Sequence, residues 1–116
     1  MVIYDVAAVA DDLLLTPEEL KEVFSLYFKD TELIVNNCKN AMARADYNEV
    51  GKNMHALKGA SLNLRMQQLG KLTAELEILS KKQVGPELPG YLAEIQSEMI
   101  AVKAQVSLFY AKLDQQ

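Results

Sequence analysis

The chain has 116 residues, of which 50% are hydrophobic and 24% are charged, and these proportions are typical of one globular domain spanning residues 1–116. Its formal net charge of −4 at pH 7 lacks the basic excess with which proteins neutralise phosphate backbones, so a nucleic-acid partner is not expected. One cysteine and one histidine cannot build an internal disulfide or a Cys/His zinc cluster, which favours a reducing cytoplasm and excludes a metal site of that kind.

The first fifteen residues are largely apolar, but they contain Asp5, Asp11 and Asp12 and no basic residue. A secretory signal peptide begins with a basic region, so this segment is interpreted as part of the fold, where a short extra helix caps one end. Nowhere does the chain contain about 18 uninterrupted apolar residues, so no membrane-spanning segment is expected.

A long helix is predicted over residues 17–45. Thr16 suits the N-cap, Pro17 suits the first helical position, and the acidic residues Glu18 and Glu19 suit the positive end of the helix dipole. The positions expected to be buried recur at spacings of three and four, and they are Leu20, Phe24, Tyr27, Thr31, Ile34, Cys38, Ala41 and Ala45.

Three further helices are predicted, over residues 47–64, 66–82 and 90–114. Asp46 is the N-cap candidate of the first. The stretch QVGPELPG at residues 83–90 is predicted to be a loop, because it holds two prolines and two glycines. The apolar seams of the last two helices are Leu69, Leu72, Leu76 and Leu79, and Leu92, Ile95, Met99, Val102, Val106, Phe109 and Leu113.

No segment alternates between apolar and polar residues with a period of two, so the fold class is predicted to be all-α. Four amphipathic helices with short connections pack most simply as an antiparallel up-down-up-down four-helix bundle. The short N-terminal helix is an addition to this bundle.

His55, the only histidine, lies in the predicted helix 47–64. At about 100° per residue, the apolar residues Val50, Leu57 and Leu64 fall within about 40° of the side opposite to His55. The imidazole is therefore expected to be exposed to solvent.

Two glycines, Gly51 and Gly59, lie one turn before and one turn after this histidine, on the same side of the helix. A glycine inside a helix costs up to about 1 kcal/mol relative to alanine, so the bare backbone is interpreted as space for the approach of another protein. Lys52, Lys58 and an exposed Leu62 share this side. An ordinary solvated histidine is the alternative interpretation.

The stretch HALKGASLNL, with LRMQQLGKLTAELE following it, resembles the histidine-containing phosphotransfer (HPt) domains of multistep two-component signalling. The motif of that family, His-x-Leu-Lys-Gly on an exposed helix of a four-helix bundle, is matched by His55, Leu57, Lys58 and Gly59. One departure is Arg65, ten residues after the histidine, where many family members have a second glycine. It affects the expected turn after the helix and adds a cation near the docking surface.

This resemblance implies that His55 accepts a phosphoryl group from an aspartyl phosphate of one response-regulator receiver domain and donates it to an aspartate of another, with Lys58 giving electrostatic support. The chain would be a stoichiometric phosphocarrier and not an enzyme, without a cofactor of its own, while Mg²⁺ is expected in the partner receiver domain. Receiver domains, a hybrid sensor histidine kinase or both are the implied partners, and a monomer is expected. The docking residues expected are Gly51, Lys52, Gly59, Leu62 and Arg65.

A second hypothesis is a non-phosphorylated interaction module that binds or sequesters a receiver domain through the same face. A kinase is disfavoured, because the sequence has no glycine-rich nucleotide loop and no acidic metal triad. On an ideal helix Ser61 and Asn63 point away from His55, so the sequence does not identify a hydrogen-bond partner for its second ring nitrogen.

Overall fold

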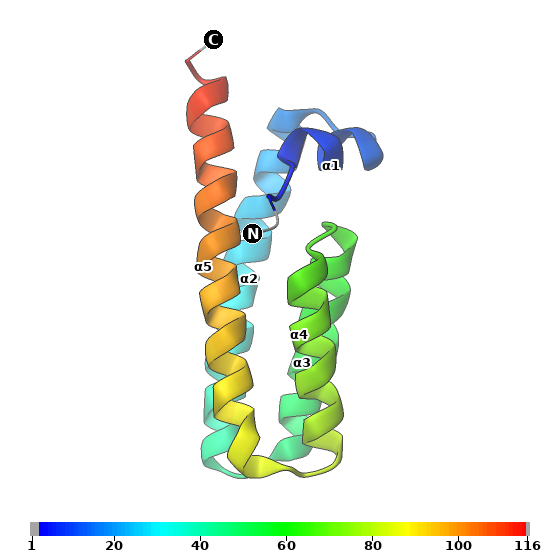
Figure 1. Cartoon of the computed structure of the whole chain (residues 1–116), viewed down its shortest axis with the longest axis vertical. Helices are drawn as coiled ribbons and strands as arrows, with labels where there is room; N and C mark the ends of the chain where they lie inside the picture. Colours follow the sequence, from blue (N-terminus) through cyan, green and yellow to red (C-terminus); the bar gives the residue numbers. More distant parts are fainter. Residues whose placement is uncertain (1–2, 116) are drawn as a thin grey trace.

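The computed structural model describes residues 3–115, which form helices with short connections and contain no β-strand. The four long helices run alternately up and down (Figure 1), and they are α2 (Pro17–Ala43), α3 (Tyr47–Asn63), α4 (Gln67–Lys81) and α5 (Leu88–Leu113). Each packs against the next, and α5 also packs against α2, which closes an elongated bundle of 49 × 24 × 21 Å. The predicted antiparallel four-helix bundle is confirmed.

A short helix, α1 (Val6–Asp12), lies across the end of the bundle near the turn between α3 and α4 (Figure 1). Just before it, the Tyr4 hydroxyl donates a hydrogen bond of 2.6 Å to the carbonyl of Leu64, in that turn. The residues that α1 buries are Val6, Val9 and Ala10. The predicted N-terminal cap of the bundle is confirmed.

Both predicted N-caps are present. The Thr16 hydroxyl accepts a bond of 3.1 Å from the Glu19 backbone N–H, and the Glu19 carboxylate accepts one of 3.0 Å from the Thr16 N–H, which together form a capping box. Asp46 accepts from the Glu49 N–H at 3.2 Å and begins α3. Local chemistry therefore sets where α2 and α3 start.

The predicted end of the first long helix is wrong, because α2 stops at Ala43. Ala45 has a backbone φ of 55°, outside the right-handed helical region, and is exposed instead of buried. Ile34 is only partly buried, and its neighbour Val35 takes the core position.

The predicted loop at residues 83–90 is also shorter than expected. Gly85–Glu87 forms a 3₁₀ turn, η1, that leads directly into α5 at Leu88. Pro89 is compatible with this start. The backbone N–H groups in the first turn of a helix have no partner within the helix, so a proline there, which lacks an N–H, removes no helical hydrogen bond.

Helices α1 to α4 all end in the same way, with one residue in the left-handed region. After α2, the Ala45 N–H bonds to the Met42 carbonyl at 3.0 Å and the Asp46 N–H bonds to the Ala41 carbonyl at 2.8 Å, the pattern of a Schellman motif. Glycine normally occupies this position because it has no Cβ. Here the four residues with positive φ are Leu14, Ala45, Arg65 and Gln83.

We expect Ala45→Gly to raise the free energy of unfolding by about 1 kcal/mol, because the left-handed conformation costs a residue with a Cβ roughly 1–2 kcal/mol. The matched control is Ala104→Gly at an exposed position inside α5, where the same change is expected to lower stability by about 1 kcal/mol. Urea unfolding measures the change in unfolding free energy for each variant. If both glycine substitutions changed stability in the same direction, this interpretation of the turn would be contradicted.

Within residues 3–115, every helix lacks an apolar run of the length needed to cross a lipid bilayer.

Candidate functional site

The orientation of α3 is set by its buried side. Val50, Met54 and Leu57 are fully buried in the bundle core. His55 lies on the opposite side, and 72% of its side chain is exposed to solvent. The predicted exposure of the histidine is confirmed, and its physical cause is the amphipathic pattern of α3.

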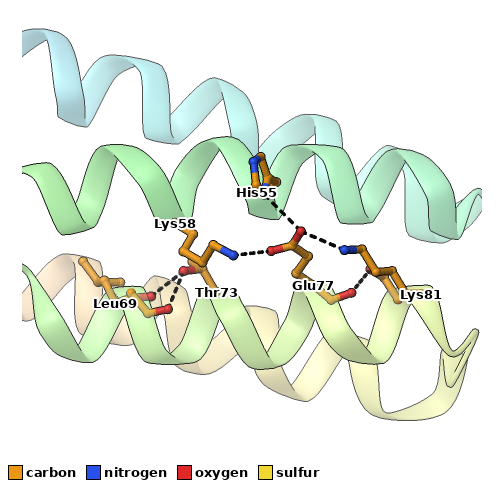
Figure 2. Close-up of polar contacts among 8 residues, drawn as sticks. His55, Lys58, Leu69, Thr73, Glu77 and Lys81 are labelled. Carbon is orange, nitrogen blue, oxygen red and sulfur yellow. Dashed lines mark hydrogen bonds and ion pairs between the residues drawn. The ribbon is translucent and has the colours of Figure 1, made fainter.

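A carboxylate from the neighbouring helix holds the imidazole. Glu77 of α4 lies beside His55, with its Oε2 atom 3.1 Å from the histidine Nδ1 (Figure 2). A carboxylate can only accept hydrogen bonds, so Nδ1 carries the proton in this contact. In the neutral ring, Nε2 then has the free lone pair.

Two lysines complete the contacts of Glu77. Lys58 of α3 donates to Glu77 Oε1 at 2.8 Å, and Lys81, one turn further along α4, approaches Oε2 at 3.3 Å (Figure 2). Only 7% of the Glu77 side chain is exposed. The result is a nearly buried anion that binds two cations and the imidazole.

The pKa of Glu77 is lowered from its ordinary value, chiefly by the hydrogen bond from Lys58, with smaller contributions from Lys81 and His55. Burial alone would raise this pKa, because it disfavours the charged form. The cations outweigh that penalty, so Glu77 is an anion at neutral pH and remains the hydrogen-bond acceptor of the imidazole.

His55 borders an open hollow of about 510 Å³ between the start of α3 and the end of α4. Lys52, Glu77 and Lys81 also line it, so its wall carries two cations and one carboxylate. Within the described residues, no group of three His, Cys, Asp or Glu side chains is arranged to hold a metal ion. The thiol Cys38 is buried, and burial raises its pKa to about 11, so it offers no accessible thiolate.

The two glycines beside the histidine have different surroundings. Gly59 is exposed, and a Cβ built there would meet no atom within 4 Å, as expected for open helix surface. Gly51 is buried against α4, where a Cβ would lie 3.0 Å from the Ser80 hydroxyl. The expectation that Gly51 is exposed is therefore wrong, since this glycine permits the close approach of two helices. It also lines the hollow beside His55, and its part in docking stays a prediction.

Arg65 is tied to the end of the bundle. Its Nε donates to Asp12 of α1 at 2.6 Å, and its Nη1 donates to the Asn63 carbonyl at 2.8 Å. Its φ of 61° explains why a glycine suits this position, and the turn keeps its Schellman hydrogen bonds without one.

The remaining predicted docking residues are accessible. Lys52 is exposed on α3, one turn before His55. Leu62 is 46% exposed, and its side chain lies over Gly70 of α4, where a Cβ would collide with it.

Sequence reasoning missed Glu77, which is 22 residues from His55 and on another helix. A weak signal was present. Glu77 precedes Lys81 by four residues and directly follows Leu76 of the apolar seam. This spacing predicts an ion pair between Glu77 and Lys81, partly buried at the edge of the seam. Its contact with the histidine depends on how α3 and α4 are placed against one another.

Comparison with known proteins gives a consistent identification. The Hpt domain family matches residues 22–105. The chain is 38% identical over 50 residues to histidine-containing phosphotransfer protein 4 of Arabidopsis thaliana, a match that covers 41% of this chain and 39% of that protein. No solved structure matches the chain. Because the family match spans most of the sequence and includes His55, Lys58 and Glu77, the chain belongs to the Hpt domain family, which supports a phosphotransfer role in two-component signalling.

Proposed function

We propose that this chain is a phosphocarrier in which His55 accepts a phosphoryl group from an aspartyl phosphate of one receiver domain and donates it to an aspartate of another. The observation that carries the proposal is the exposed imidazole whose Nδ1 is held by the anionic Glu77. A nucleophile for an external protein must be reachable, and this one is. The chain contributes the carrier atom and the docking surface, and it acts stoichiometrically.

The transfer step follows from the state of the ring. With the proton on Nδ1, the lone pair of Nε2 attacks phosphorus, the new N–P bond forms as the P–O bond to aspartate breaks, and the aspartate leaves as a carboxylate. No proton has to move. The ring becomes cationic, and Glu77 stabilises that charge through its contact with Nδ1. Donation to the second receiver is the same step in reverse.

Mg²⁺ and most of the stabilisation of the transferring group are assigned to the partner receiver domain. Lys58 supports the site by keeping Glu77 ionised and in place. The proposed contacts for the incoming domain are Gly59, Lys52 and Leu62. Arg65 instead joins the end of α3 to α1 through its hydrogen bond to Asp12. The proposed partners are receiver domains and hybrid sensor kinases, the proposed compartment is the cytoplasm, and the proposed state is a monomer.

The test is transfer from a ³²P-labelled phosphorylated receiver domain to the purified chain, with His55→Gln as the control. We expect label on the wild type only, lost in acid and stable in base, as a phosphoramidate bond requires. His55 is exposed, so the variant is expected to keep its circular dichroism spectrum and unfolding midpoint.

Two outcomes would contradict the proposal. Label retained by a folded His55→Gln variant would assign the phosphoryl group to another residue. Absence of label from any of several receivers, despite measurable binding, would favour the non-phosphorylated interaction module.

A further inference from the structure

Charge is unevenly distributed between the helices. Residues 47–82, which form the α3–α4 hairpin, hold six of the 12 Lys and Arg residues and three of the 16 Asp and Glu residues. The hairpin therefore carries a net charge of +3, whereas the rest of the chain carries −7. In Figure 1 the hairpin forms one side of the bundle, and α2 and α5 form the other. The molecule is thus electrically polarised, with His55 on its basic side.

The cations of this basic side differ in whether a carboxylate of the chain already pairs with them. Lys58 and Lys81 bind Glu77, and Arg65 binds Asp12. Lys52, Lys71 and Lys82 are exposed, and among residues 3–115 no carboxylate oxygen lies within 4 Å of their ammonium groups. None of the three takes part in an ion pair among those residues, and Lys71 borders an open hollow that Asp5, Asp12 and Glu98 also line. Because no ion pair neutralises these charges, their field extends outward.

The helical pattern places these lysines on the outer surface of the hairpin. On α4 the buried seam is formed by Leu69, Leu72 and Leu76. Lys71 lies on the opposite side of that helix, together with Ile78, which is 52% exposed, and Lys82 follows the last residue of the helix. On α3, Lys52 and Leu62 share the side of His55. We call these six residues the hairpin surface: Lys52, His55, Leu62, Lys71, Ile78 and Lys82.

We propose that the hairpin surface selects and steers receiver domains whose surface around the phosphorylated aspartate is acidic, an inference that rests on the proposed function. A phosphoryl group beside metal-binding carboxylates is a concentrated anionic target, and the free lysines attract it over a distance of about 10 Å at moderate salt. The acidic remainder of the chain repels the same target, so encounters are oriented toward His55. Leu62 and Ile78 supply apolar contact once the two surfaces meet.

Electrostatic steering acts on the rate of association. Complementary charge raises association rates by roughly 10- to 1000-fold, and the gain disappears as salt screens it. We expect the second-order rate constant of transfer from an acidic receiver domain to fall on the order of tenfold between about 20 mM and about 500 mM KCl.

The decisive variant is Lys71→Gln/Lys82→Gln, which leaves His55, Lys58, Glu77 and Lys81 untouched. We expect it to slow transfer on the order of fivefold at low salt and to match the wild type at high salt. The matched control is Lys29→Gln/Lys39→Gln on α2, which makes the same change in net charge at exposed positions of the acidic side. We expect that control to stay within about twofold of the wild type at every salt concentration.

Phosphoramidate, a small phosphoryl donor that needs no docking surface, separates this inference from the proposed function. Equal labelling of His55 by phosphoramidate in the wild type and both double variants shows that the chemistry is intact. A transfer rate that does not depend on salt would then overturn electrostatic steering, and so would equal slowing by both double variants. Either result would leave the proposed phosphocarrier function standing. Absence of label from both phosphoramidate and receiver domains would overturn the proposed function itself.

Discussion

We expect Gly59→Glu to slow phosphoryl transfer on the order of 100-fold while leaving the chain folded. Gly59 lies one turn after His55, is exposed, and has no atom within 4 Å of the position that a Cβ would occupy. The new side chain therefore fits the isolated bundle, and the higher helix propensity of glutamate stabilises α3 by about 0.5 kcal/mol. The loss arises only when a receiver domain must approach the imidazole closely.

Two controls separate the possible causes of this loss. Gly90→Glu makes the same substitution at another exposed glycine with open space around it, in the first turn of α5, and is expected to transfer at the wild-type rate. Gly59→Gln keeps the size of the side chain and removes its charge. If Gly59→Gln transfers normally, charge and not obstruction is responsible; if Gly59→Glu itself transfers normally, the docking surface lies elsewhere.

The second large effect concerns Glu77. We expect Glu77→Gln to lower the free energy of unfolding at pH 7 by about 2 kcal/mol, because hydrogen bonds to a charged group contribute roughly 1.5–3 kcal/mol and the ammonium of Lys58 would lose its buried partner. Transfer is expected to slow as well, since the cationic phosphorylated ring loses its counter-charge. Urea unfolding and the labelling assay measure the two effects.

The stability effect has a defined dependence on pH. The pKa of Glu77 in the folded chain is below its ordinary value of 4.5, so the stability that it contributes is fully present above about pH 4.5 and is lost as the pH falls through the folded pKa. The difference in unfolding free energy between wild type and Glu77→Gln is therefore expected to shrink as the pH falls below about 4.5 and through the folded pKa of Glu77.

Glu75→Gln, two residues earlier on α4, is the matched control, because among the described residues Glu75 takes part in no ion pair. It is expected to leave stability within about 0.5 kcal/mol of the wild type at pH 7. A Glu77→Gln difference that persists unchanged to pH 3 would show that the ion pairs contribute nothing and that packing accounts for the loss.

Much of the fold followed from local patterns in the sequence. Thr16 and Asp46 have side chains that satisfy the free N–H groups of a helix start, and both cap helices in the structure. The spacing of Val50 and Leu57 determined which side of α3 is buried, and so predicted that His55 is exposed. These properties depend on residues within a few turns of one another, which is why the sequence was sufficient.

The errors at helix ends have a different cause. The termination of α2 at Ala43 requires Ala45 to adopt a left-handed conformation, which a residue other than glycine does not signal. The start of α5 within a proline- and glycine-rich stretch likewise depends on Leu88 being buried in the core. At Leu88, tertiary packing outweighed the local preference.

By itself, the sequence determined the four amphipathic helices, the exposure of His55 and the motif that carries its chemistry. Only the tertiary structure decided that Glu77 binds the imidazole, that Gly51 is a packing contact and that Arg65 pairs with Asp12. The physical reason is that each of these contacts joins two helices. Their relative rotation and axial shift come from the packing of the whole core, which no periodicity within one helix specifies.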